Sequence, residues 1–80
     1  MTLLDAPDNI CLKIRDFLGG EIVCRRLLSL GFHRNDVVRL DSRAPFKGPL
    51  LVLNVTSGTQ VALGRSVAHK IVVDADHGAR

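Results

Sequence analysis

Five side chains in this sequence are thiols or imidazoles, the groups that most often serve as nucleophiles, general bases and metal ligands. They are Cys11, Cys24, His33, His69 and His77. Nucleophilic catalysis would need one of the cysteines beside a histidine and an orienting group. The histidines lie 36 and 8 residues apart, which is not the paired spacing of a structural zinc site. We therefore predict no catalytic residue and no resident metal site.

The other candidates for chemistry are weaker. Asp74, Asp76 and His77 could chelate an ion only adventitiously, because a mobile tail does not hold its ligands in place. Cys24 falls on the apolar face of a predicted helix, where a cysteine behaves as a small hydrophobe. No glycine-rich phosphate loop occurs in the chain. The sequence predicts a protein that is not an enzyme and carries no cofactor.

The composition is that of one small domain, residues 1–80, with an aliphatic core. Hydrophobic residues make up 46% of the chain and charged residues 24%, so a core can form without metal or disulfide staples. Trp and Tyr are absent, and the aromatic residues are Phe17, Phe32 and Phe46. Without aromatic walls the chain cannot build a polyproline groove, and it is a poor platform for stacking bases. An RNA-binding barrel is therefore the least favoured alternative.

The formal net charge of +3 suits attraction to an acidic protein face, nucleic acid or anionic lipid. The basic residues are scattered, however, so a solvated surface is the simpler interpretation. Two cysteines do not make a disulfide framework. No signal peptide opens the chain, and the longest apolar run, 49–53, is far below the ~20 residues of a membrane span. We expect a cytoplasmic protein.

The first half of the chain predicts a strand and then a helix. Alternation over residues 10–15 predicts a strand with Ile10, Leu12 and Ile14 facing inward. A break over 16–20 precedes a helical period from Glu21, which ends at Gly31 in an expected left-handed cap. The predicted apolar face of the helix contains Val23, Cys24, Leu27, Leu28 and Leu30. The predicted outer face contains Arg25, Arg26 and Ser29, and Glu21 is spaced to pair with Arg25.

The second half predicts four more strands. They cover 36–43, the segment before a hairpin turn at 56–59, the segment after that turn, and 70–74, with a helical turn at 66–69. The predicted inward rows are Val38 and Leu40, then Leu51, Leu53 and Val55, then Val61 and Leu63. The core is expected over about 10–74. Residues 1–9 are expected to be a flexible leader that packs along the barrel, and 75–80 to fray. About five short strands close most naturally into a small barrel.

The string Arg26-Leu27-Leu28-Ser29-Leu30-Gly31-Phe32 resembles the FeoA family, small cytosolic proteins associated with bacterial ferrous iron uptake. The resemblance continues through Asp36-Val37-Val38 and the loop Ala44-Pro45-Phe46-Lys47-Gly48-Pro49. It ends with 61–65 and 68–73, and covers about residues 10–74 in the expected order. Each motif is weak alone, whereas five in sequence are fairly specific.

The resemblance implies a mainly β, SH3-like barrel of about five strands with one α-helix inserted between strands 1 and 2. It implies an accessory role beside a FeoB-like ferrous iron permease, whose cytosolic part carries a GTPase domain, and by family name a link to transition metal ion binding. The domain also resembles the C-terminal module of diphtheria-toxin-repressor-type metal regulators. A regulatory module of that kind is the alternative, disfavoured because no winged helix precedes this domain. Self-association is left open.

Two departures from the family pattern carry expectations of their own. Where a glycine turn commonly follows the helix, this chain has His33-Arg34-Asn35-Asp36, and Asn or Asp is expected to take a positive φ there. Gly64 stands where an arginine often follows leucine, and it marks an expected bulge in the fourth strand.

Protein–protein contact is the remaining function class. The loop 44–49 is expected either to project Phe46 toward a partner or to fold it back over the barrel mouth. We hypothesise one surface that joins the outer helix face to this loop and meets an acidic patch on the permease. Its residues are Arg25, Arg26, Pro45, Phe46, Lys47 and Pro49.

Overall fold

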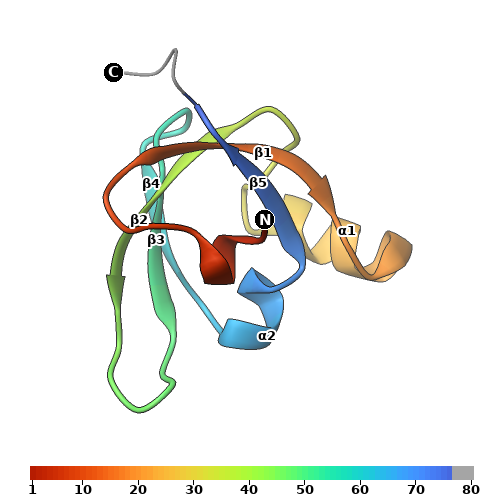
Figure 1. The fold of residues 1–80 in the computed structure, drawn as a ribbon. Coiled ribbons are helices and arrows are strands. Elements are labelled where there is room, and N and C mark those ends of the chain that lie inside the picture. Colours follow the sequence, from red (N-terminus) through yellow and green to blue (C-terminus); the bar gives the residue numbers. More distant parts are fainter. Residues whose placement is uncertain (77–80) are drawn as a thin grey trace.

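The strands form one antiparallel, five-stranded sheet in the order β4-β3-β2-β1-β5. The computed structural model describes residues 1–76, and Figure 1 shows the sheet curving around the centre of the molecule. The elements are η1 (Leu3–Asp5), β1 (Cys11–Phe17), α1 (Gly20–Ser29), β2 (Val37–Arg43), β3 (Leu50–Asn54), β4 (Thr59–Leu63), α2 (Arg65–Ala68) and β5 (Ile71–Ala75). This confirms the predicted mainly β architecture with a helix between the first and second strands.

Two register shifts help the sheet to curve. β1 shifts against β5 between Ile14 and Asp16, and β2 shifts against β3 between Leu40 and Ser42. An extra residue in one strand bends that strand and increases its twist. β1 extends to Phe17, so Asp16 and Phe17 belong to this strand and not to the break that was expected at 16–20.

The core is aliphatic, as predicted. The inward residues of β1, Leu12 and Ile14, are fully buried, and so are Val38 and Leu40 of β2. Ile10 precedes β1 and is 38% exposed, so its predicted inward place is wrong. The other buried apolar residues are Leu3, Ala6, Phe17, Leu27, Phe32, Leu50, Val52, Leu63, Ala68, Ile71 and Val73.

The predicted inward row of β3 is wrong by one residue. Leu50, Val52 and Asn54 are buried, whereas Leu51 and Leu53 are only half-buried and Val55 is exposed. The cause is the register with β2, which places Val38 opposite Asn54 and Leu40 opposite Val52. Residues directly opposite each other in a sheet share a face. Because residues 50–53 are all apolar, alternation could not reveal which of them face the core.

The apolar face of α1 is narrower than predicted. Leu27 is fully buried, and Val23 and Cys24 pack partly against the core. Leu28 and Leu30 are each 40% exposed. α1 rests against β1 at one side of the barrel, so only a narrow stripe of this short helix is covered. The predicted outer residues Arg25, Arg26 and Ser29 are all exposed.

The core begins earlier than residue 10. Leu3 is fully buried and Ala6 nearly so. Thr2 forms an isolated bridge with Val72, and the Val73 amide donates to the Met1 carbonyl over 2.9 Å. The expected start of the core at about residue 10 is therefore too late, and the expected packing of the leader along the barrel is confirmed. At the other end, Ala75 belongs to β5, and the predicted fraying of 77–80 lies outside the described residues.

The turn after α1 forms as the sequence predicts. Gly31 has a φ of +95°, the left-handed conformation that closes a helix at little steric cost. Asn35 has a φ of +73°, which confirms the expected positive φ in the 33–36 turn. The expected bulge at Gly64 is wrong. β4 pairs with β3 without a shift, and Gly64 follows it as the residue that precedes α2.

Candidate interaction surface

The tip of the β2–β3 hairpin, Pro45–Gly48, projects an aromatic side chain into solvent. Phe46 is 99% exposed, so the alternative in which it covers the barrel mouth is wrong. Phe46 and Lys47 have φ values of +58° and +59°, and the Gly48 amide donates to the Pro45 carbonyl over 3.1 Å. Positive φ at both central positions is the geometry of a type I′ turn, for which Asn-Gly is the usual sequence. A Phe-Lys pair there costs conformational energy, of order 1–2 kcal/mol per residue.

The tip has little room to relax. A Cβ built on Gly48 would lie 2.7 Å from the Ala44 Cβ and 3.1 Å from the Pro45 carbonyl oxygen. The Ala44 amide also donates to the Pro49 carbonyl over 3.0 Å. Pro45 and Pro49, both exposed, restrict the backbone on either side. The phenyl ring of Phe46 is therefore presented on a narrow, restricted turn.

Arg43 anchors the base of this hairpin, a role that sequence reasoning missed. Its guanidinium donates to the Leu4 carbonyl over 2.9 Å, to the Ala6 carbonyl over 2.7 Å and to Asp8 Oδ1 over 2.9 Å. These contacts join the end of β2 to η1 and to the segment that leads from η1 to β1. No spacing signal could have found them, because their partners lie 35 to 39 residues away.

The outer face of α1 is a second exposed surface. Ile22 is 83% exposed there, although the sequence analysis did not single it out. Arg25 pairs with Glu21 over 2.6 Å, which confirms the predicted contact. Such an exposed pair within one helix contributes only ~0.3–0.5 kcal/mol. Among the described residues, the Arg26 side chain forms no ion pair.

The structure does not join these two surfaces. In Figure 1, α1 lies at the right of the molecule, whereas the β2–β3 tip lies at the lower left. α1 leads into the start of β2, whereas the tip follows the end of this strand of 7 residues, about 20 Å further along. The single surface predicted from Arg25, Arg26 and the 45–49 loop is therefore two separate surfaces. The local sequence contained no information on this separation.

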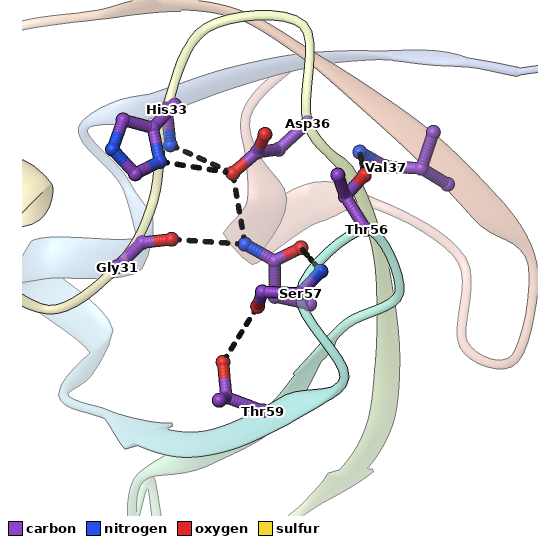
Figure 2. A network of polar contacts seen from close by, with 8 residues as sticks. Gly31, His33, Asp36, Val37, Thr56, Ser57 and Thr59 are labelled. Carbon is purple, nitrogen blue, oxygen red and sulfur yellow. Dashed lines mark hydrogen bonds and ion pairs between the residues drawn. The ribbon is translucent and has the colours of Figure 1, made fainter.

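A polar network holds the other hairpin, β3–β4, against the body of the molecule (Figure 2). Asn54 is 1% exposed. Its Nδ2 donates to the Gly31 carbonyl over 3.0 Å and to Asp36 Oδ2 over 2.9 Å, and its Oδ1 accepts from the Ser57 amide over 3.2 Å. The Val37 amide donates to Thr56 Oγ1 over 2.9 Å. A buried amide with partners on all these sides is structural, because every polar atom is satisfied.

Within residues 1–76, the thiols and imidazoles are not brought together. His33 contacts Asp36, whose Oδ2 accepts from the His33 amide over 3.0 Å and lies 3.4 Å from His33 Nδ1. Cys11 and Cys24 are free and half-buried. His69 is exposed, Asp74 pairs with Arg15 over 2.7 Å, and His77 lies outside the described residues. Within residues 1–76, no three His, Cys, Asp or Glu side chains are grouped to hold a metal ion.

Hydrogen bonds lower the pKa of two surface carboxyl groups. Arg39 Nε donates to Asp41 Oδ1 over 2.7 Å and Gln60 Nε2 donates to Asp41 Oδ2 over 2.9 Å, and both lower the pKa of Asp41. The Phe17 amide, which donates to Asp16 Oδ1 over 2.8 Å, lowers the pKa of Asp16, and Arg34 adds to the effect. Donors to an ionised carboxylate favour its charged form. Neither group is poised to exchange a proton near neutral pH.

Comparison with known proteins gives one family. The family model described as the FeoA domain matches residues 1–75. No curated protein sequence gives a significant match. Within residues 1–76, no helix has both the length and the apolar character needed to cross a membrane.

Solved structures share the fold across almost the entire chain. A FeoA protein from Chlorobium tepidum is 24% identical with a TM-score of 0.82, and the match covers all of this chain and 74% of that one. A FeoA-like protein from Clostridium acetobutylicum is 20% identical with a TM-score of 0.82, over all of this chain and 93% of that one. A manganese-dependent transcriptional repressor is 24% identical with a TM-score of 0.82, over 94% of this chain but 36% of that one. The fold is the SH3-like one that FeoA proteins share with part of such repressors.

Proposed function

Because this chain belongs to the FeoA domain family, we propose that it is a cytoplasmic accessory protein of bacterial ferrous iron uptake that docks on the cytosolic part of a FeoB-like permease. The observation that carries the proposal is the family match over residues 1–75. Supporting it, proteins described as an iron uptake regulatory protein and as iron(II) transport protein A share its fold with TM-scores of 0.80 and 0.85. The proposal assigns the chain a binding role and no catalytic step.

Iron is the cargo of the permease in this proposal, and this chain need not hold it. A borderline divalent ion takes several nitrogen, oxygen or sulfur ligands together. The described His, Cys, Asp and Glu side chains do not form such a group. We therefore propose that the link to transition metals lies in the partner.

We assign docking to the β2–β3 tip. Phe46 is a large aromatic side chain with almost its whole surface available for burial, and buried aromatic anchors dominate the energy of many interfaces. The restricted turn lowers the entropy lost when that anchor is bound. Lys47 adds one positive charge beside it, which would favour an acidic rim around an apolar pocket on the permease.

The outer face of α1 is assigned a lesser part. Arg25 is already paired with Glu21, which leaves Arg26 as the cation without an ion pair among the described residues of this face. An exposed rim charge changes the association rate and its salt dependence more than the dissociation rate. Since the two surfaces are separate, one partner domain would have to be large to reach both.

Binding of the purified chain to the cytosolic domain of a FeoB-like permease tests this assignment. We expect Phe46→Ser to weaken binding by more than about tenfold, mainly through faster dissociation. The matched control is Ile22→Ser, which removes an apolar side chain that is 83% exposed on α1 and should weaken binding far less than Phe46→Ser does. Arg25→Ala/Arg26→Ala should alter association at low salt and have little effect at high salt.

The outcomes separate clearly. If Ile22→Ser weakens binding and Phe46→Ser does not, docking uses α1 rather than the tip. If the parent protein does not bind the permease domain at all, the docking proposal is wrong. The alternative function is a regulatory module that acts with a metal-responsive repressor, supported by the shared fold with such repressors. Binding of this chain to a purified repressor, with no binding to the permease domain, would favour that alternative.

A further inference from the structure

The sheet has two edge strands, and they differ in whether another backbone segment covers their outer side. β5 lies at one edge, and residues Met1–Thr2 run along its outer side through the Thr2–Val72 bridge and the 2.9 Å bond from the Val73 amide to the Met1 carbonyl. β4 lies at the other edge, and among the strands of the described chain it pairs with β3 alone. Within residues 1–76, no backbone segment bonds to the outer side of β4.

β4 also lacks the features that usually protect an edge. Natural edge strands carry lysines or other charges, prolines, or bulges that turn the backbone away from a second chain. β4 reads Thr59-Gln60-Val61-Ala62-Leu63, with no charge and no proline. Its pairing with β3 is continuous over all five residues, whereas β1 and β2 both contain register shifts. Thr59, Gln60 and Ala62 are exposed.

The side chains beside this edge are held in place. Gln60 Nε2 donates to Asp41 Oδ2 over 2.9 Å, and Asp41 is in turn paired with Arg39 over 2.7 Å. Val61 packs partly against the core. An edge with ordered side chains loses less conformational entropy when another strand is added.

We propose that a second copy of this chain pairs with β4, so that two β4 strands run antiparallel about a two-fold axis at Val61. In that register Val61 faces its counterpart, Gln60 faces Ala62, and Thr59 faces Leu63. No charge is placed opposite a like charge, and paired β-branched side chains favour a sheet. The two sheets would then continue as one across the dimer.

The self-complementary register of β4 favours a copy of the same chain as the occupant, and the protected β5 edge explains why assembly would stop at two. A β4 edge that paired with the β5 edge of the next copy would make an open-ended filament, because such a contact is head-to-tail. Met1 and Thr2 cover part of β5 and oppose that contact. Pairing of β4 with β4 uses the same edge twice and closes on itself.

The mass of the purified chain as a function of concentration tests the proposal. We expect a shift from 8.7 kDa toward twice that mass as the concentration rises. The double variant Gln60→Lys/Ala62→Lys places lysines opposite each other across the proposed axis, and should weaken association by about tenfold or more. The matched control Ser29→Lys/Ser66→Lys adds the same charge at exposed helical positions and should associate as the parent does.

Hydrogen exchange gives a readout that needs no substitution. Outward-facing β4 amides should become more protected as concentration rises, whereas protection of the β5 amides should not change. A mass that stays at 8.7 kDa up to about millimolar concentration, where even a weak interface is populated, would overturn the proposal. So would a dimer that the Gln60→Lys/Ala62→Lys variant forms as readily as the control, since that dimer must use another face. Thermal unfolding of both variants shows whether each remains folded.

Discussion

The β2–β3 and β3–β4 hairpins share strand β3 but are held by different contacts. The β3–β4 turn is bound to the body of the molecule by Asn54, Thr56 and Ser57, which together reach the turn after α1 and the start of β2. Beyond Arg43, the β2–β3 tip is closed by the Ala44–Pro49 and Pro45–Gly48 backbone bonds. Its Phe46 side chain is 99% exposed. The β3–β4 hairpin is held by polar contacts within the fold. The β2–β3 hairpin instead presents an apolar side chain to solvent.

This difference separates residues kept for stability from those available for function. A buried Asn with several partners is costly to remove, because each group that it bonded loses that hydrogen bond. A fully exposed Phe on a left-handed backbone contributes nothing evident to the core and costs conformational energy.

The largest effect on stability is expected in α1, next to the turn that binds the β3–β4 hairpin. Leu27 is fully buried, and its carbonyl accepts a hydrogen bond from the Phe32 amide over 3.0 Å. In the same turn, Asn54 donates to the Gly31 carbonyl. Leu27→Ala should lower the free energy of unfolding by roughly 2–5 kcal/mol. Chemical denaturation measures this. A loss below about 0.5 kcal/mol, typical of a surface substitution, would mean that the helix face is assigned wrongly.

Asn54→Leu tests the network directly. It keeps nearly the same shape but leaves the Gly31 carbonyl and the Ser57 amide without their partner. We expect a loss of about 2–3 kcal/mol. The control is Gln60→Leu, which removes an exposed amide with one bond to Asp41 and should cost less than about 0.5 kcal/mol. Equal effects in the two variants would contradict the structural role of Asn54.

At the projecting hairpin, Gly48→Ala should destabilise by about 1–2 kcal/mol, since the new methyl group would overlap the Ala44 side chain. Exchange of the Ala44 amide, which bonds to Pro49 across the hairpin, should accelerate in this variant. An unchanged midpoint of denaturation would show that the tip opens freely in solution.

A substitution at the same tip should increase the stability of the protein. Lys47→Gly relieves a positive φ of +59°, and should raise stability by about 0.5–1 kcal/mol after the greater entropy of an unfolded glycine is included. Thermal unfolding is the measurement. A gain in stability would show that Lys47 does not stabilise the fold, in contrast to Asn54. A loss would mean that the tip does not hold the left-handed geometry.

The smallest effect concerns pH. Asp41 lies on β2, and the hydrogen bonds from Arg39 and from Gln60 of β4 lower its pKa from the ordinary value of an aspartate in the folded chain. Its stabilisation is therefore complete above the pKa of the unfolded state and is lost as the pH falls through the lower, folded value. The stability difference between the parent and Asp41→Asn should shrink as the pH falls from about 5 to 2. A constant difference would contradict the assignment.

Much of the fold could be predicted because it depends on local rules. Alternation found β2 and the later strands, the helical period found α1, and Gly31 and Asn35 took the positive φ values expected of them. The exposed placement of Arg25 and Arg26 was also predicted, whereas the prediction for Phe46 left open whether it projects or covers the barrel mouth. Each of these depends on steric preferences or on a pattern within a few residues.

What the tertiary structure alone decided lies in the relations between segments. Leu50-Leu51-Val52-Leu53 has no polar member to mark its outer face, so the register with β2 chose Leu50 and Val52 for the core and brought Asn54 in with them. The covering of Leu3, the exposure of Leu28 and Leu30, and the three contacts of Arg43 depend on partners distant in sequence. The separation of α1 from the hairpin tip has the same origin. A local pattern specifies what a segment can bury, whereas the packing of distant segments determines what is actually buried and which exposed residues are neighbours.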